Sequence, residues 1–244
     1  MILANNKKII VSNVHKSFGK KDVLTSVSMD VEEREIFGLL GPSGAGKTTL
    51  VKMIAGIDEA TRGTIKVLDV EMPKLHVLHK IGFMAQSDAL YGELSAVENL
   101  EFFATIYGLK EPVRKERIEK ALTLVNLTDE RKKQVNQFSG GMKRRLSLAA
   151  ALLHEPEILI LDEPTVGIDP VLRQSIWNEF IELTRQGTTI IVTTHVMDEA
   201  EKCNRLGMIR DGSLIAVGTP EELKKNTDST TIEEAFLYFG GVHK

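Results

Sequence analysis

The stretch Gly41-Pro42-Ser43-Gly44-Ala45-Gly46-Lys47-Thr48-Thr49 decides how this chain folds. It fits the pattern G-x-x-x-x-G-K-[ST], with Gly41, Gly46, Lys47 and Thr48 at the fixed positions. Residues 36–40 before it are apolar and predict a short buried strand, and residues 50–55 after it predict a helix. A glycine-rich loop between a strand and a helix predicts a phosphate-binding site.

The chemistry expected of this loop follows from its residue types. Glycines let the backbone curl so that several N–H groups point at one anion, and the helix that begins there adds the positive end of its dipole. Lys47 would reach the terminal phosphates of a nucleotide, and the hydroxyl of Thr48 would ligate Mg²⁺. The alternative is a glycine turn with a surface lysine, which leaves the flanking strand and helix unexplained.

A second apolar run ends in two adjacent carboxylates. Residues 157–162 read Glu-Ile-Leu-Ile-Leu-Asp, which predicts a buried parallel strand, and Glu163 follows Asp162 directly. We expect Asp162 to hold Mg²⁺ and Glu163 to polarise an attacking water. A purely structural strand is the alternative, although two neighbouring acids are costly without a cation beside them.

Three single residues are candidates because of where they stand. Gln86 follows a predicted strand at 81–84 and His195 follows one at 188–193, and ligands of α/β sheets gather at such strand ends. Gln86 is equally consistent with a surface residue. His195 fits either a structural role or a hydrogen bond to a γ-phosphate or water. Phe18 fits either base stacking or the core.

Residues 137–146 read Gln-Phe-Ser-Gly-Gly-Met-Lys-Arg-Arg-Leu and indicate a second anion site. Ser139 is a good N-cap for a helix that continues toward residue 154, and Gly140 and Gly141 stand at its start. Basic residues near a helix start oppose the helix dipole, so we expect a negative partner nearby. The alternative is an ordinary capped helix.

The remaining pattern predicts one α/β domain over residues 1–244 with a strand-rich beginning. Residues 8–12 and 23–31 read as strands, and residues 18–22 read as the turn region between them. This arrangement puts an antiparallel β piece in front of the phosphate loop.

A block of helices interrupts the alternation of strands and helices. It begins with a capping box of Ser95 and Glu98, and Pro112 opens a further helix. We expect a helical subdomain over about 87–154, inserted into a core formed by about 1–86 and 155–244.

Composition narrows the class of protein. The net charge of −3 gives no support for a broad nucleic-acid-binding surface, and the single cysteine, Cys203, makes no internal disulfide. Residues 1–8 hold no long apolar core, which is unlike a secretory signal, and no run approaches the roughly 20 apolar residues of a membrane helix. We therefore expect a soluble or peripheral protein.

The ordered set of motifs resembles the ATP-binding subunit of an ABC transporter over nearly the whole chain. Residues 41–48 resemble Walker A, residues 138–142 the signature motif and residues 158–163 Walker B. Gln86, Asp169 and His195 then resemble the Q-loop, D-loop and H-loop residues. Phe18 stands where the family carries its base-stacking aromatic. The resemblance implies a P-loop NTPase core of the RecA-like type.

Two segments depart from the commonest family pattern. The signature reads Phe-Ser-Gly-Gly-Met rather than beginning with Leu and ending with Gln, and the D-loop segment reads Val-Gly-Ile-Asp rather than Ser-Ala-Leu-Asp. The serine, both glycines and the aspartate are kept. The run Ser-Gly-Gly-Met-Lys-Arg-Arg is most similar to the daunorubicin-resistance and related ABC-2 export branch.

The resemblance implies a mechanism shared between two chains. ATP with Mg²⁺ would bind residues 41–49 of one chain and Ser139, Gly140, Gly141 and Asp169 of a second ATP-binding subunit, either a copy or a paralogue. Thr48, Gln86 and Asp162 would hold the metal. The residues expected to take part in catalysis are Glu163, His195, Gln86 and Lys47.

The same resemblance implies a place in the cell. Hydrolysis would drive a separate transmembrane permease that exports a drug, lipid or polysaccharide-type substrate. The chain would lie on the cytoplasmic face of the membrane, with the region 86–99 docked on the permease.

Two other readings compete with an exporter ATPase. A soluble ABC ATPase of DNA repair, chromosome maintenance or translation would usually carry tandem ATP domains, zinc modules or coiled coils, and this chain shows one ATP domain and no heptad run. A P-loop kinase or GTPase would leave Ser139-Gly140-Gly141 unexplained.

Overall fold

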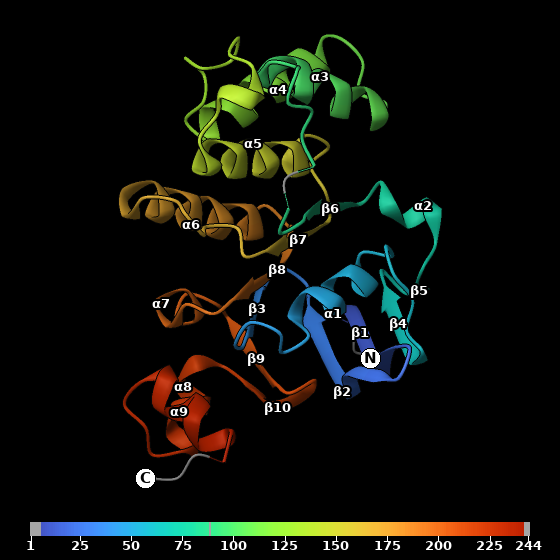
Figure 1. The fold of residues 1–244 in the computed structure, drawn as a ribbon, viewed down its shortest axis with the longest axis vertical. Coiled ribbons are helices and arrows are strands. Elements are labelled where there is room, and N and C mark those ends of the chain that lie inside the picture. Colours follow the sequence, from blue (N-terminus) through green and yellow to red (C-terminus); the bar gives the residue numbers. More distant parts are fainter. Residues whose placement is uncertain (1–5, 88, 242–244) are drawn as a thin grey trace, which may run out of the picture.

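The computed structural model describes residues 6–87 and 89–241, so residues 1–5 of the segment that was compared with a secretory signal lie outside the described residues. The centre of the molecule is a six-stranded sheet (Figure 1). Its order is β10 (Ser213–Gly218), β9 (Arg205–Arg210), β3 (Ile36–Leu40), β8 (Thr189–Thr194), β7 (Ile158–Asp162), β6 (Ile81–Met84). Neighbouring strands are parallel, except that β10 runs antiparallel to β9.

A second, antiparallel sheet lies to one side of the first (Figure 1). Its order is β2 (Lys21–Glu32), β1 (Lys7–Phe18), β4 (Arg62–Val67), β5 (Val70–Glu71). The predicted antiparallel β piece is confirmed. Its first strand is longer than predicted, because β1 continues through irregular pairing to Phe18, which pairs with Lys21. The turn is therefore confined to the two residues between them.

Helices cover both faces of the central sheet. They are α1 (Lys47–Ile54), α2 (Leu75–Leu78), α6 (Pro170–Arg185), α7 (Met197–Ala200), α8 (Pro220–Asn226) and α9 (Ile232–Phe239). The short elements β5, α2 and α7 were not predicted, since two to four residues carry too little periodicity to be recognised. Among the described residues, no helix is long and apolar enough to span a membrane.

The predicted helical block is present as α3 (Ala96–Ile106), α4 (Val113–Leu124), a 3₁₀ turn (Val135–Gln137) and α5 (Gly140–Leu152). The capping box of Ser95 and Glu98 is confirmed at the start of α3. Pro112 precedes the first residue of α4, as its N-cap. In Figure 1 these helices lie together above α6 and the β6 edge of the sheet.

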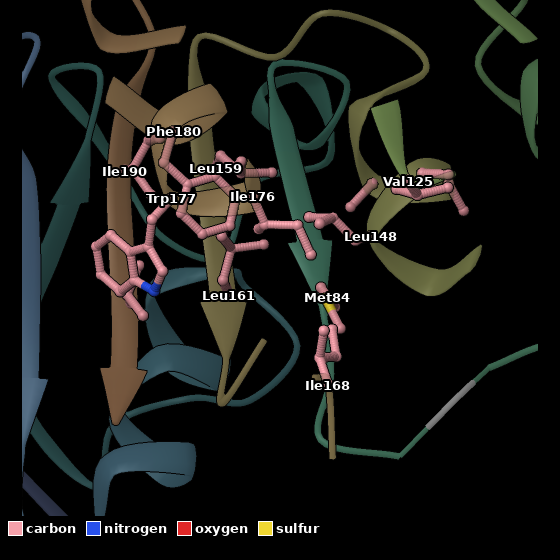
Figure 2. Close-up of a cluster of buried hydrophobic side chains, with 14 of the residues drawn as sticks. Met84, Val125, Leu148, Leu159, Leu161, Ile168, Ile176, Trp177, Phe180 and Ile190 are labelled. Atoms are coloured by element: carbon pink, nitrogen blue, oxygen red, sulfur yellow. The ribbon is translucent and has the colours of Figure 1, made fainter. Parts of the chain in front are cut away.

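The central strands are buried on both faces, and their side chains divide between two cores. Ile158 and Ile160 pack with the antiparallel sheet and α1. Leu159 and Leu161 pack on the opposite side, where Figure 2 shows them beside Phe180 and other side chains of α6. Each buried aliphatic side chain contributes roughly 1.5–3 kcal/mol, so this strand anchors both layers and fixes where its carboxyl end lies.

His154 joins the helical block to the sheet. It follows α5, its ring stacks on Tyr107 at the end of α3 with centroids 3.7 Å apart, and its Nε2 lies 3.1 Å from the carbonyl oxygen of Ile81 in β6. The Nδ1 atom is buried without a hydrogen-bond partner. Burial therefore lowers the pKa of His154 from 6.5 to about 4.

We predict that His154 makes the stability of the protein fall in mild acid. The unfolded chain binds a proton at His154 below about pH 6.5 and the folded chain only below about pH 4, so stability is complete above pH 6.5 and is lost between these values. The loss expected by pH 4 is about 1–3 kcal/mol. Urea unfolding of the natural protein and His154→Gln from pH 7.5 to 4.5 measures it.

The matched control is His76→Gln, which replaces an exposed histidine of α2. The His76→Gln protein should keep the acid dependence of the natural chain, whereas His154→Gln should flatten it. Parallel stability curves for the natural protein and His154→Gln would contradict this account.

Candidate functional site

The predicted loop links β3 to α1, and Lys47 is the first residue of that helix. The Lys47 ammonium is 5% exposed and donates hydrogen bonds to the carbonyl oxygens of Gly41 and Pro42, at 2.7 and 3.1 Å. Burial lowers the pKa of Lys47, and the nearby carboxylates of Glu163 and Asp162 oppose that shift. The charge is therefore held inside the loop by oxygen atoms on several sides.

Two glycines of the loop have no room for a side chain. Gly46 has a φ of 105°, and a Cβ there would lie 2.5 Å from Cδ2 of Leu24. A Cβ on Gly41 would lie 2.2 Å from the carbonyl oxygen of Ile209. The loop is therefore closely packed between β2 and β9, and this packing fixes the position of its N–H groups.

A cavity of about 480 Å³ opens over the loop. The predicted site residues that line it are Ser43, Gly44, Gly46, Lys47, Thr48, Thr49, Gln86 and Glu163. Sequence reasoning missed the opposite wall, which is formed by Lys21, Asp22, Val23, Asp211 and Gly212. The strand order brings the β9–β10 turn to the loop, where the N–H of Gly212 donates to the carbonyl of Ala45 at 3.2 Å.

Asp162 ends β7 next to this cavity and is fully buried. Its Oδ1 accepts a hydrogen bond from the hydroxyl of Thr193 at 2.5 Å, whereas its Oδ2 is buried without a partner. A buried carboxylate oxygen without a partner is costly unless a cation or donor satisfies it. The donor set of Asp162, Thr48 and Gln86 therefore fits a hard cation such as Mg²⁺.

Glu163, Lys47 and His195 converge beside Asp162. One carboxylate oxygen of Glu163 lies 3.1 Å from Nδ1 of His195 and 3.7 Å from Nζ of Lys47. Glu163 has a φ of 53°, and its N–H lies 3.0 Å from the hydroxyl of Thr193. Thr193, which the sequence did not single out, thus binds the carboxylate of one acid and the backbone of the next.

A second group of predicted residues lies outside the lining of this cavity. Ser139 is the N-cap of α5 and accepts from the N–H of Met142, and Asp169 is the N-cap of α6. A Cβ on Gly141 would lie 2.9 Å from the carbonyl oxygen of Gly167. The start of α5 and the turn before Asp169 are therefore packed together, with Ser139, Gly140 and Asp169 exposed.

Two of the basic residues near the start of α5, Arg144 and Arg145, donate to backbone carbonyl oxygens of this chain. Arg144 donates to backbone carbonyls that include that of Glu163, and Arg145 donates to those of Val125 and Asn126. Both guanidinium groups are thus solvated by carbonyl oxygens, and the negative partner expected near the start of α5 stays a prediction.

Phe18 lies at the end of β1 and is 53% exposed. The ammonium of Lys16 stands 4.8 Å from its ring centroid. The core alternative for Phe18 is therefore wrong. The ring is accessible, and Lys21, which pairs with it across the hairpin, lines the cavity.

The comparison with known families decides the identity of this fold and site. A family model described as ABC transporter matches residues 24–166. The chain belongs to the ABC transporter family. It is 43% identical over 92% of its length to the linearmycin resistance ATP-binding protein LnrL of Bacillus subtilis (strain 168), of which it covers 76%.

Other relatives carry the same family description. The probable multidrug ABC transporter ATP-binding protein YbhF of Escherichia coli (strain K12) is 40% identical over 91% of this chain. This chain spans only 40% of the length of YbhF. A Nod factor export ATP-binding protein I of Burkholderia lata is 40% identical over 86% of this chain and 70% of the relative.

Solved structures share the architecture of this ABC cassette. The ATP-binding subunit of an ABC transporter matches with a TM-score of 0.88 and 26% identity, over 95% of this chain and 99% of the other. A dimeric ATP-binding cassette in a post-hydrolysis state, bound to ADP and Pi, matches with a TM-score of 0.81 and 27% identity, over 86% and 98%. The chain is an ATP-binding, ATP-hydrolysing cassette of this family.

We predict that Thr193→Val destabilises the cassette by about 1–3 kcal/mol, because it leaves a second buried oxygen of Asp162 without a donor. The valine keeps the volume of the side chain, so the loss reports the hydroxyl. Chemical denaturation of Thr193→Val and Thr193→Ser measures it. Thr193→Ser retains the hydroxyl and should stay within about 1 kcal/mol of the natural protein. Equal stability of all three proteins would contradict this role.

Proposed function

We propose that this cassette powers export of a drug, lipid or polysaccharide-type substrate, by binding and hydrolysing Mg-ATP for a separate transmembrane subunit. The observation that carries the proposal is the convergence of Lys47, Glu163 and His195 beside an unpartnered buried oxygen of Asp162. This arrangement offers a cation for phosphate and a base for water in one cavity, with a carboxylate for a metal directly beside it.

Each group has a part in that chemistry. The N–H groups of residues 41–49 and the ammonium of Lys47 bind the phosphates. Thr48, Asp162 and Gln86 would hold Mg²⁺, which would supply positive charge to the phosphates. Glu163 accepts the proton of the attacking water, and His195, 3.1 Å away, fixes the orientation of that carboxylate. Phe18 stacks on the base.

A second ATP-binding chain completes the site. Ser139, Gly140, Gly141 and Asp169 do not line this chain's own cavity, and three of the four are exposed. The N–H groups of Gly140 and Gly141 and the hydroxyl of Ser139, at the start of α5, are suited to the phosphates of a nucleotide held by a neighbouring chain. The dimeric form of a solved cassette supports this arrangement. The second chain is a copy or a paralogue.

We predict that Glu163→Gln stops turnover, lowering kcat at least about 100-fold, and traps an ATP-bound dimer. The amide keeps the shape of the side chain but accepts no proton from water. Size-exclusion chromatography with light scattering, with and without Mg-ATP, measures the association. A Glu163→Gln protein that hydrolyses ATP normally would remove Glu163 from the mechanism.

Two further substitutions separate binding from association in that background. Lys47→Ala, combined with Glu163→Gln, should abolish the ATP-dependent change from monomer to dimer. It removes the cation at the phosphates and therefore weakens ATP binding itself. Ser139→Ala, combined with Glu163→Gln, should lower the fraction of dimer while leaving nucleotide binding to the single chain intact. Dimerisation unaffected by Ser139→Ala would contradict the proposed part of α5.

Export and the membrane partner are supported by two further observations. The relatives are named for linearmycin resistance, multidrug transport and Nod factor export. A cavity of about 270 Å³ between β6 and the helical block is lined mainly by apolar side chains, including those of Leu90 and Phe103. Ile106, nearby on α3, is 63% exposed. We propose that this surface, with the described part of residues 86–99, receives a cytoplasmic helix of the permease at the membrane surface.

We predict that Ile106→Asp weakens membrane attachment while ATP binding stays within about threefold. The charge would be unfavourable against an apolar helix and lies far from the nucleotide cavity. Sedimentation of the tagged chain with membranes from its own host measures attachment, and Val171→Asp, on the exposed start of α6, is the matched control. Tight binding to nucleic acid or ribosomes instead would favour the soluble class of ABC ATPase.

A further inference from the structure

Arg144, in the second turn of α5, makes an unusual set of contacts for a charged side chain. Its side chain is 7% exposed, and its guanidinium donates to four backbone carbonyls. Nη1 lies 2.8 Å from the oxygen of Ala85 and 2.9 Å from that of Gln86. Nη2 donates to the carbonyl oxygen of Asp162 and, at 2.6 Å, to the carbonyl oxygen of Glu163. Nε donates to the same oxygen of Glu163 at 3.2 Å.

These carbonyls belong to two segments that the sheet brings side by side. β6 and β7 are parallel neighbours, and the four residues lie at or just beyond their carboxyl ends. Beyond the last pair of the ladder, carbonyl oxygens need new donors. The planar guanidinium carries five N–H donors in a fixed fork, so one side chain can bind both strand ends in a single relative position.

Two of the residues that Arg144 holds, Gln86 and Glu163, belong to the nucleotide cavity. Gln86 lines the nucleotide cavity, and Glu163 lies 3.7 Å from Lys47 in the same cavity. Glu163 adopts a positive φ, which non-glycine residues hold only when their surroundings impose it. The guanidinium on its carbonyl and the hydroxyl of Thr193 on its N–H hold the peptide groups on both sides of the Cα atom of Glu163.

We propose that Arg144 is a positioning residue for ATP hydrolysis. It holds Gln86 and Glu163 in one position relative to each other and connects both residues to helix α5. The proposal rests on the proposed function, since it gives Glu163 and Gln86 their parts in hydrolysis. It adds a physical link within helix α5. Ser139, the N-cap of α5, is the residue proposed to contact the second chain's nucleotide, and Arg144, about one and a half turns further along the helix, contacts the base of its own chain's site.

The neighbouring Arg145 provides a matched control. It stands on the same helix and also donates to two backbone carbonyls, those of Val125 and Asn126, at 3.0 and 2.9 Å. Both acceptors belong to the loop after α4, inside the helical block. Removing Arg145 therefore loses similar hydrogen bonds without touching either strand end.

The experiment compares Arg144→Gln, Arg144→Lys and Arg145→Gln with the natural protein. Steady-state hydrolysis gives kcat, and equilibrium binding of a fluorescent ATP analogue gives both Kd and the number of sites per chain. Arg144→Gln should lower kcat about tenfold or more, as expected when reacting groups are misplaced by a fraction of an ångström. Kd should stay within about threefold and stoichiometry at one, because residues 41–49 are untouched. Arg145→Gln should keep kcat within about threefold.

Arg144→Lys is the more conservative variant, and it keeps the proposal testable if Arg144→Gln does not fold. It keeps the positive charge but cannot present a planar fork to both strand ends, so its kcat should fall between those of the natural protein and Arg144→Gln, with Kd unchanged. Amide hydrogen exchange supplies a second readout. Peptides that contain Ala85 and Glu163 should exchange faster in both Arg144 variants, whereas peptides of α1 should not change.

Three results would overturn the proposal. The first is a kcat of the Arg144 variants equal to that of Arg145→Gln. The second is a loss of rate matched by loss of binding sites, which would show unfolding rather than misplacement. The third is the absence of hydrolysis in the natural protein and in Arg145→Gln, which would overturn the proposed function as well and so differs from a failure specific to Arg144.

Discussion

The attraction between the Lys47 ammonium and the carboxylates of Asp162 and Glu163 is the interaction on which the rest of the structure depends. A buried ammonium is unfavourable unless oxygen atoms surround it, and burial does lower the pKa of Lys47. Two loop carbonyls and two carboxylates reduce that cost. The lysine comes from the strand–helix junction of β3 and α1, whereas the carboxylates come from β7. The central sheet must therefore place β3, β8 and β7 in this order for the charges to meet, and the two cores on its faces hold that order.

The helical block is tied to this charge centre through two contacts of different chemistry. His154 joins α5 to β6 through a neutral ring, and its ring stack keeps the end of α3 in place. Arg144 joins the same helix to the ends of β6 and β7 through a permanent charge. One contact weakens in acid and the other does not, because a guanidinium stays protonated. The block is thus a separate layer in Figure 1 whose position is nonetheless defined by named side chains.

Local patterns predicted the parts of the site that a short stretch of chain builds by itself. The strand, loop and helix around Lys47 could be recognised because periodicity and glycine spacing are properties of ten consecutive residues, and the capping box at Ser95 is equally local. Thr193 and Arg144 could not be found in this way. Thr193 reads as one more β-branched strand residue, and Arg144 as one of several bases on a helix. Their roles depend on which strands are neighbours and on where a side chain ends. The cavity wall at Asp211 and Gly212 depends on strand order for the same reason.

The separation of Ser139 and Asp169 from their own chain's cavity has a consequence for control of the reaction. A lone chain holds the phosphate loop, the proposed metal ligand Asp162 and the proposed base Glu163, but Ser139, Gly140 and Asp169 are exposed outside that cavity. Under the proposed function, electrostatic stabilisation of the reacting phosphates is complete only when a second chain arrives, so a free cassette hydrolyses ATP slowly. In the proposed dimer, helix α5 contacts the neighbour's nucleotide through Ser139 and the backbone of Glu163 through Arg144. One helix then connects the nucleotide bound at one site to the backbone of the proposed base at the other, which gives the two ATP sites a direct physical connection.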